Sequence, residues 1–159
     1  RIRRDHWRSG RISYAALRTG DRFRGSDRRE IMRLVIGGAF QGKKDYVKNT
    51  FHLEDGEMQD GANASYEDIF SCPCLYHFHQ WIRKGLEENW DLEDLETRLL
   101  ERNPQIILIS NELGYGVVPI QAFDRKYREA TGRICTRIAA KSSQVIRVVC
   151  GIGTVIKNA

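Results

Sequence analysis

The chain has 159 residues, 41% hydrophobic and 30% charged, which is enough for about one domain with a buried core. It contains no apolar run of about 18 residues and no signal-peptide pattern, so we expect no membrane span and a cytoplasmic location. Its four cysteines stand in an otherwise ordinary composition, which favours reduced thiols over a disulfide scaffold.

The formal net charge of +5 is concentrated at the start of the chain. Residues 1–30 hold ten arginines and four acidic residues, whereas the rest holds 16 basic and 17 acidic residues, so the domain itself does not favour nucleic-acid binding. Segment 1–31 lacks a hydrophobic period, and its end can be encoded by a purine-rich run resembling a ribosome-binding site. We interpret it as a disordered leader or translated upstream sequence, with Met32 as the biological start. The alternative is an arginine-rich nucleic-acid arm.

A glycine-rich stretch, GGAFQGKK, lies between a strand predicted at 34–36 and a helix predicted at 43–49. In such a context the backbone N–H groups of the loop and the helix N-terminus together favour phosphate. The residues that we assign to nucleotide binding are Gly37, Gly38, Ala39, Phe40, Gln41, Gly42, Lys43 and Lys44. Lys43 is also assigned a catalytic role at the outer phosphates. The alternative is a plain glycine turn.

The last residue of this stretch departs from the phosphate-loop pattern. G-x-x-x-x-G-K is normally followed by Ser or Thr, whose hydroxyl helps to hold Mg²⁺, but here Lys44 follows. Two outcomes are physically possible. In the first, Lys44 swings away or takes over part of the metal's charge-neutralising role, and phosphate binding stays intact. In the second, magnesium-dependent transfer is weak or lost. We expect binding to survive this substitution better than catalysis.

The middle of the chain predicts one loop, one strand and two helices. Segment 52–67 is polar and punctuated by glycine, which is typical of a loop. A short apolar run predicts a strand at 69–72, and helical patterns follow from 75 to about 84 and from 92 to 102.

Two cysteines and two histidines crowd into eight residues at the start of the first of these helices. They are Cys72, Cys74, His77 and His79. One residue between the members of each pair is awkward for four tetrahedral ligands, so we expect no zinc. We expect both cysteine side chains to be buried in the core and one of the two histidines to face either a ligand or the core.

The last third of the chain alternates strands with a helix. A continuous β-branched run predicts a buried strand at 106–110, and a glycine loop at 111–119 leads to an amphipathic helix at 123–141. Strands are predicted at 145–150 and 152–156. The whole pattern predicts an α/β, P-loop-containing three-layer fold with a mostly parallel sheet, over a nucleotide-binding domain at 32–159.

Glu112 directly follows the strand at 106–110. Because ligands of open α/β sheets bind beyond the carboxyl ends of strands, we assign Glu112 a catalytic role, orienting magnesium or a substrate hydroxyl. Capping of the loop is the alternative. Tyr115, between two glycines, offers a stacking face. The candidates for phosphate contacts on the following helix are Arg125, Arg128 and Arg133.

From Ile106 to Lys157 the chain resembles the adenosylcobinamide kinase/adenosylcobinamide-phosphate guanylyltransferase family of cobalamin biosynthesis. The matching motifs are NELG and GVVP after a strand, a helix with RKYRE and GR, and a closing GIG. Gly37 to Lys43 also resemble the family's opening G-G-A-x-x-G-K-S. No histidine follows the acidic stretch from Asp55 to Met58 at the family's spacing, so the residue that carries a guanylyl group is not assigned.

The resemblance implies phosphorylation of the aminopropanol hydroxyl of adenosylcobinamide, a corrinoid, followed by GMP transfer from GTP. It also implies ATP or GTP with Mg²⁺ as cofactors and a homo-oligomer, trimeric in the family's pattern, without nucleic acid. The alternative is a non-catalytic nucleotide- or corrinoid-binding protein of the same fold. A nucleic-acid binder that uses the arginine arm is a weaker alternative.

Overall fold

The computed structural model describes residues 32–114 and 119–159, in which six strands form one sheet. The strands are β1 (Arg33–Gly37), β2 (Met58–Asp60), β3 (Cys74–Tyr76), β4 (Ile107–Asn111), β5 (Gln144–Val149) and β6 (Ile152–Asn158). The α-helices are α1 (Lys43–Phe51), α2 (Phe78–Glu87), α3 (Leu95–Arg102) and α4 (Ala122–Lys141). Two short 3₁₀-helices are η2 (Asp55–Glu57) and η3 (Asp68–Phe70). The leader 1–31 and Tyr115, for which we made predictions, lie outside the described residues.

The sheet has the order β2-β3-β4-β1-β5-β6, and all neighbouring strands are parallel except β5 and β6. Central β1 pairs Leu34 with Leu108 of β4 and with Val145 of β5. β5 and β6 form a hairpin whose two turn residues, Cys150 and Gly151, both have positive φ, as a tight hairpin turn requires. The prediction of a mostly parallel sheet is confirmed.

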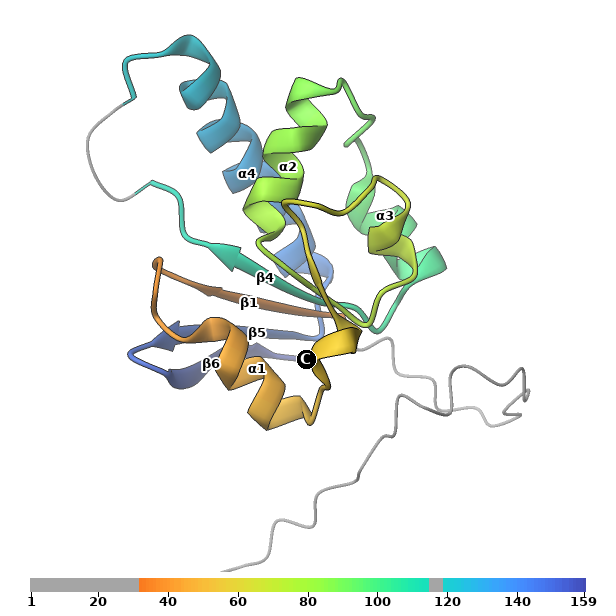
Figure 1. Ribbon diagram of the computed structural model, residues 1–159, viewed down its shortest axis with the longest axis vertical. Coiled ribbons are helices and arrows are strands. Elements are labelled where there is room, and N and C mark those ends of the chain that lie inside the picture. The colour runs from red at the N-terminus through yellow and green to blue at the C-terminus, as the bar shows by residue number, and fades with distance from the viewer. Residues whose placement is uncertain (1–31, 115–118) are drawn as a thin grey trace, which may run out of the picture.

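Helices cover both faces of the sheet, so the prediction of three layers is also confirmed (Figure 1). Helix α1 lies on one face, where Val35 packs with Val47 and Ile146. Helices α2, α3 and α4 lie on the other face, where Leu34 belongs to the larger core cluster. Successive strand residues point to opposite faces, so a continuous apolar strand such as β1 supplies both cores at once.

Three predictions for the middle of the chain are wrong. The strand expected at 69–72 is the 3₁₀-helix η3 and a turn, and the helix expected from residue 75 begins only at Phe78, after β3. The loop expected at 52–67 contains η2 and the three-residue strand β2. Short apolar runs do not distinguish strand from helix, and here the parallel pairing of β3 with β2 and β4 decided the outcome.

An aromatic cluster fixes α2 against the rest of its layer. The indole of Trp81 is fully buried, and its ring centroid lies 5.9 Å from that of Phe78, 6.0 Å from that of Tyr66 and 5.1 Å from that of Trp90. Its Nε1–H donates to the carbonyl of Ser65 at 3.0 Å. Because α2 begins at the carboxyl end of β3, this packing also positions the residues at that edge of the sheet.

Across residues 32–114 and 119–159, none of the helices combines the length and the apolar character that crossing a lipid bilayer requires.

Candidate nucleotide-binding site

The glycine-rich loop lies where the sequence placed it, between β1 and α1. A Cβ atom on Gly37 would lie 2.4 Å from the carbonyl oxygen of Val148, so the close approach of β1 to β5 requires glycine. Gly42 has φ 79° and forms the N-cap of α1, and the side chain of Phe40, with φ 58°, is fully exposed. The positive φ values turn the chain into the helix N-terminus, which is the electrostatic feature that favours an anion.

The turn between β5 and β6 supports this loop from outside it. The Gly151 N–H donates to the Gln41 carbonyl at 2.8 Å, and the Cys150 N–H donates to Gln41 Oε1 at 2.7 Å. A Cβ on Gly42 would lie 3.3 Å from the Cα of Gly151. No local sequence pattern predicts this support, because the two segments lie more than a hundred residues apart in the chain.

Lys43 points along the loop rather than into solvent. It is 8% exposed, and its Nζ donates to the Gly38 carbonyl at 2.6 Å and to Asn111 Oδ1 at 2.8 Å. Burial lowers the pKa of Lys43, and the carboxylate of Glu112 opposes part of that effect. An anion bound in the loop would replace these neutral acceptors with a charged one, which favours the ammonium form.

Lys44 turns away from the loop. Its Nζ lies 4.1 Å from the ring centroid of Tyr76, in cation–π geometry, on the β3 side of the site. Where a phosphate loop has a hydroxyl, this chain therefore has an ammonium group against an aromatic ring.

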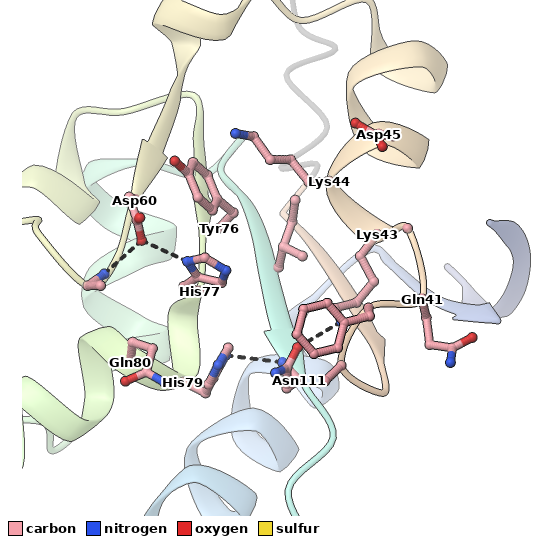
Figure 2. A pocket seen from close by; sticks show the side chains of 15 residues that line it. Gln41, Lys43, Lys44, Asp45, Asp60, Tyr76, His77, His79, Gln80 and Asn111 are labelled. Carbon is pink, nitrogen blue, oxygen red and sulfur yellow. Dashed lines mark hydrogen bonds and ion pairs between the residues drawn. The ribbon is translucent and has the colours of Figure 1, made fainter. Parts of the chain in front are cut away.

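A cavity of about 760 Å³ opens between the loop and the carboxyl ends of β2, β3 and β4. Its size is within the range of small-molecule sites. In Figure 2, Gln41 and Lys43 lie on one side, Asp60, His77 and Gln80 lie on the other, and Asn111 lies between them. The remaining lining residues are Ala39, Phe40, Gly42, Lys44, Asp45, Ala62, Tyr76, His79 and Ile109.

The two histidines of the crowded segment face this cavity with different bonding. His77 Nδ1 lies 2.9 Å from Asp60 Oδ1, at hydrogen-bond distance, at the ends of β3 and β2. His79 is buried, and its Nδ1 accepts the backbone N–H of Asn111 at 3.2 Å. Burial lowers the pKa of His79 to about 4, with smaller contributions from the positive charges of His77 and Lys43. The sequence indicated both histidines as candidates but did not predict their hydrogen-bond partners, Asp60 and Asn111.

The two cysteines of that segment point away from the cavity. Cys72 belongs to the core cluster on the α2 face and Cys74 to the cluster on the α1 face, as expected for core thiols. Burial raises the pKa of Cys72 to about 12 and that of Cys74 further. In the described part of the chain, no three His, Cys, Asp or Glu side chains gather as a metal ion would need.

Glu112 lies beyond β4, but outside the lining of the main cavity. Its two carboxylate oxygens accept hydrogen bonds from Arg147 of β5, at 2.9 and 3.1 Å. With these oxygens engaged and Lys44 in place of the hydroxyl, neither Glu112 nor position 44 offers a ligand to a magnesium ion in this arrangement. Glu112 instead lines a smaller hollow of about 300 Å³ beside α4.

The arginines proposed as phosphate ligands are not brought together. Arg125 donates to the carbonyls of Pro119 and Ile120, and Arg133 pairs with Glu129 on the exposed face of α4. Of the three arginines, Arg128 lines the smaller hollow, and none lines the main cavity.

Comparison with known proteins places the C-terminal part of the chain in a known group. The sequence model of the family described as cobinamide kinase/cobinamide phosphate guanyltransferase matches residues 71–156. A curated protein of Escherichia coli strain K12, named bifunctional adenosylcobalamin biosynthesis protein CobU, is 31% identical over 80 residues. The protein of the same name from Salmonella typhimurium strain LT2 is 36% identical over 80 residues. Each match covers 49% of this chain and 44% of the relative, so the chain aligns with less than half of the relatives' length.

Proposed function

Because the chain belongs to the cobinamide kinase/cobinamide phosphate guanyltransferase family, we propose that it binds a nucleoside triphosphate and phosphorylates a corrinoid hydroxyl. The triphosphate is ATP or GTP, the loop from Gly37 to Lys44 binds its phosphates, and the acceptor is the aminopropanol hydroxyl of adenosylcobinamide. Subsequent GMP transfer is the less supported half, because no residue is assigned to carry the guanylyl group.

One observation carries the proposal. Lys43 is buried in a glycine loop at a helix N-terminus, with its ammonium group held by two neutral oxygens beside a large cavity. An outer phosphate can replace those oxygens and form a charge-assisted bond. The loop lies outside the residues matched by the family, so this argument is independent of the similarity.

Neither Lys44 nor Glu112, which is paired with Arg147, supplies a ligand to a magnesium ion. A Mg²⁺ that arrives with the nucleotide would depend mainly on phosphate oxygens and water, which this ion commonly retains as ligands. We therefore expect nucleotide binding to depend less on magnesium than in loops that end in Ser or Thr. The proposed catalytic role of Glu112 requires its carboxylate to leave Arg147 first.

A homo-oligomer is also part of the proposal. The edge strand β6 exposes three large apolar side chains, Ile152, Val155 and Ile156, and an uncovered apolar edge favours self-association. Light scattering coupled to size-exclusion chromatography would measure the number of chains in each particle.

A second candidate function is a non-catalytic protein that binds nucleotide or corrinoid. It is favoured by Lys44 in place of a hydroxyl and by Glu112 in a bidentate pair with Arg147. Both features reduce transfer chemistry more than binding.

Calorimetric titration of ATP and GTP, each with and without Mg²⁺, tests the loop. Lys43→Met keeps the packing of the stem and removes the ammonium, so triphosphate affinity should fall about ten- to a hundredfold, as for a lost charge-assisted hydrogen bond. Lys48→Met is the matched control, because Lys48 lies on the same helix, pairs with Asp55 and does not line the cavity. Equal affinity in wild type and Lys43→Met would show that the loop is only a turn.

Lys44→Ser restores a hydroxyl and removes a cation. Metal-dependent binding should then improve or stay unchanged, whereas weaker binding would identify Lys44 as a phosphate ligand. Incubation of the wild type with labelled nucleotide and adenosylcobinamide separates the two candidate functions. Phosphorylated corrinoid supports the kinase, and nucleotide binding without transfer supports the non-catalytic protein.

A further inference from the structure

We propose that His77 is the general base of the phosphoryl transfer and that Asp60 is the residue that positions it, an inference that rests on the function proposed above. No sequence motif predicts this pair, since 17 positions separate the two residues. The neighbouring strands β2 and β3 bring them together at the edge of the sheet that forms the cavity.

The bond between the two side chains determines which ring nitrogen is available. Asp60 Oδ1 lies 2.9 Å from His77 Nδ1 and also accepts the Ala62 N–H at 3.0 Å. Because a carboxylate only accepts, Nδ1 carries the hydrogen and the neutral ring has its lone pair on Nε2. The His77 side chain is 50% exposed, and both residues line the cavity that also contains Lys43 (Figure 2).

The backbone at His77 directs its side chain toward the cavity. His77 has φ 53° and ψ 41°, a left-handed conformation at the junction of β3 and α2. It turns the chain from the end of β3 into the first turn of α2 and so determines where the imidazole projects.

The neighbouring imidazole cannot take the same role. The rings of His77 and His79 are 5.8 Å apart, but Nδ1 of His79 already accepts the Asn111 N–H, so its Nε2 carries the hydrogen. The cavity therefore contains one histidine that presents a lone pair and one that can only donate. The other charged groups that line the cavity are Asp60 of β2 and Lys43, Lys44 and Asp45 of α1.

The step balances without a further reactant. The substrate hydroxyl oxygen forms a bond to the γ-phosphorus while its proton moves to Nε2 of His77. The bond from the γ-phosphorus to the β,γ-bridging oxygen breaks, and the nucleoside diphosphate leaves with that electron pair. Asp60 stabilises the resulting imidazolium, which releases its proton to water after the products depart.

Asparagine substitutions provide a matched test. His77→Asn tolerates the left-handed backbone and can still donate to Asp60, but it has no basic nitrogen. His52→Asn is the control, since His52 has nearly the same backbone angles (φ 55°, ψ 43°), is exposed and does not line the cavity. We expect kcat for phosphoryl transfer to fall about a hundredfold or more in His77→Asn, with nucleotide Kd unchanged and the control equal to wild type.

The pH profile and the Asp60 variants separate a base from a structural residue. The limb of kcat that rises with pH in the wild type should be absent in His77→Asn. Asp60→Asn should lower kcat with little change in KM, and Asp60→Glu should partly restore it. A His77→Asn kcat within about threefold of wild type, or an acid-labile nucleotide adduct that is lost in His77→Asn, would overturn the proposal while leaving the kinase intact. Wild type that binds nucleotide without transferring phosphate overturns both the kinase and its base.

Discussion

Acidification should destabilise the folded chain through His79. This side chain is 4% exposed, and its Nδ1 accepts the Asn111 N–H, so the folded state requires the neutral ring. Burial, assisted by the charges of His77 and Lys43, lowers the pKa of His79 from 6.5 to about 4. Between these two values the unfolded chain holds a proton on this imidazole and the folded chain does not. Stability therefore falls as the pH falls.

The size of the effect follows from the difference between the two pKa values. Each pKa unit corresponds to about 1.4 kcal/mol, so protonation of His79 should cost about 2 kcal/mol of unfolding free energy by about pH 5 and about 3 kcal/mol by about pH 4. This is a large share of the roughly 5–15 kcal/mol that stabilises a typical domain.

Urea denaturation at several values between about pH 4.5 and 8 measures this dependence. His79→Asn is the comparison, because its side-chain oxygen can accept the Asn111 N–H without titrating. The other histidines are present in both proteins, so the difference in slope isolates His79. Equal slopes of unfolding free energy against pH in the two proteins would refute the argument that the folded state excludes the protonated ring.

Two further predictions concern packing. Gly37→Ala should lower the free energy of unfolding by about 1–3 kcal/mol and weaken triphosphate binding, because the new Cβ would lie 2.4 Å from the Val148 carbonyl oxygen. Gly132→Ala, on an open face of α4, should instead raise the free energy of unfolding by about 0.5–1 kcal/mol. Trp81→Ala should cost about 3–5 kcal/mol, and Trp90→Ala less because that ring is only partly buried. Chemical denaturation measures all four variants, and a Gly37→Ala protein as stable as wild type, or equal losses at the two tryptophans, would contradict these estimates.

The elements predicted correctly are those whose local pattern leaves little choice. β1 and β4 contain continuous apolar runs that suit buried parallel strands, and α4 has an apolar stripe over 20 residues. β5 is also rich in β-branched residues, although Arg147 interrupts its apolar run. β2 could not be predicted in this way, because its three residues, Met-Gln-Asp, form a strand only through pairing with β3.

In the candidate site, too, some residues could be predicted from local sequence and others only from the pairing of strands. The glycine-rich loop and Lys43 could be proposed as a site from the local sequence, since the glycines and the lysine are close in the chain. Asn111 was expected only as the start of a loop. Its Oδ1 accepts a hydrogen bond from Lys43 Nζ, and its backbone N–H donates one to His79 Nδ1. That double contact depends on β4 lying between β1 and β3 in the sheet.

The sequence by itself determined the layered α/β architecture, the glycine-rich loop between β1 and α1, and the family resemblance, because each depends on local motifs whose residues lie close together in the chain. Only the tertiary structure decided which groups meet in the cavity. The pairing of β2 with β3 brought Asp60 to His77, and the hairpin after β5 brought Gly151 to the loop. A contact of this kind spans many residues and is set by the order of strands in the sheet, which no local pattern encodes.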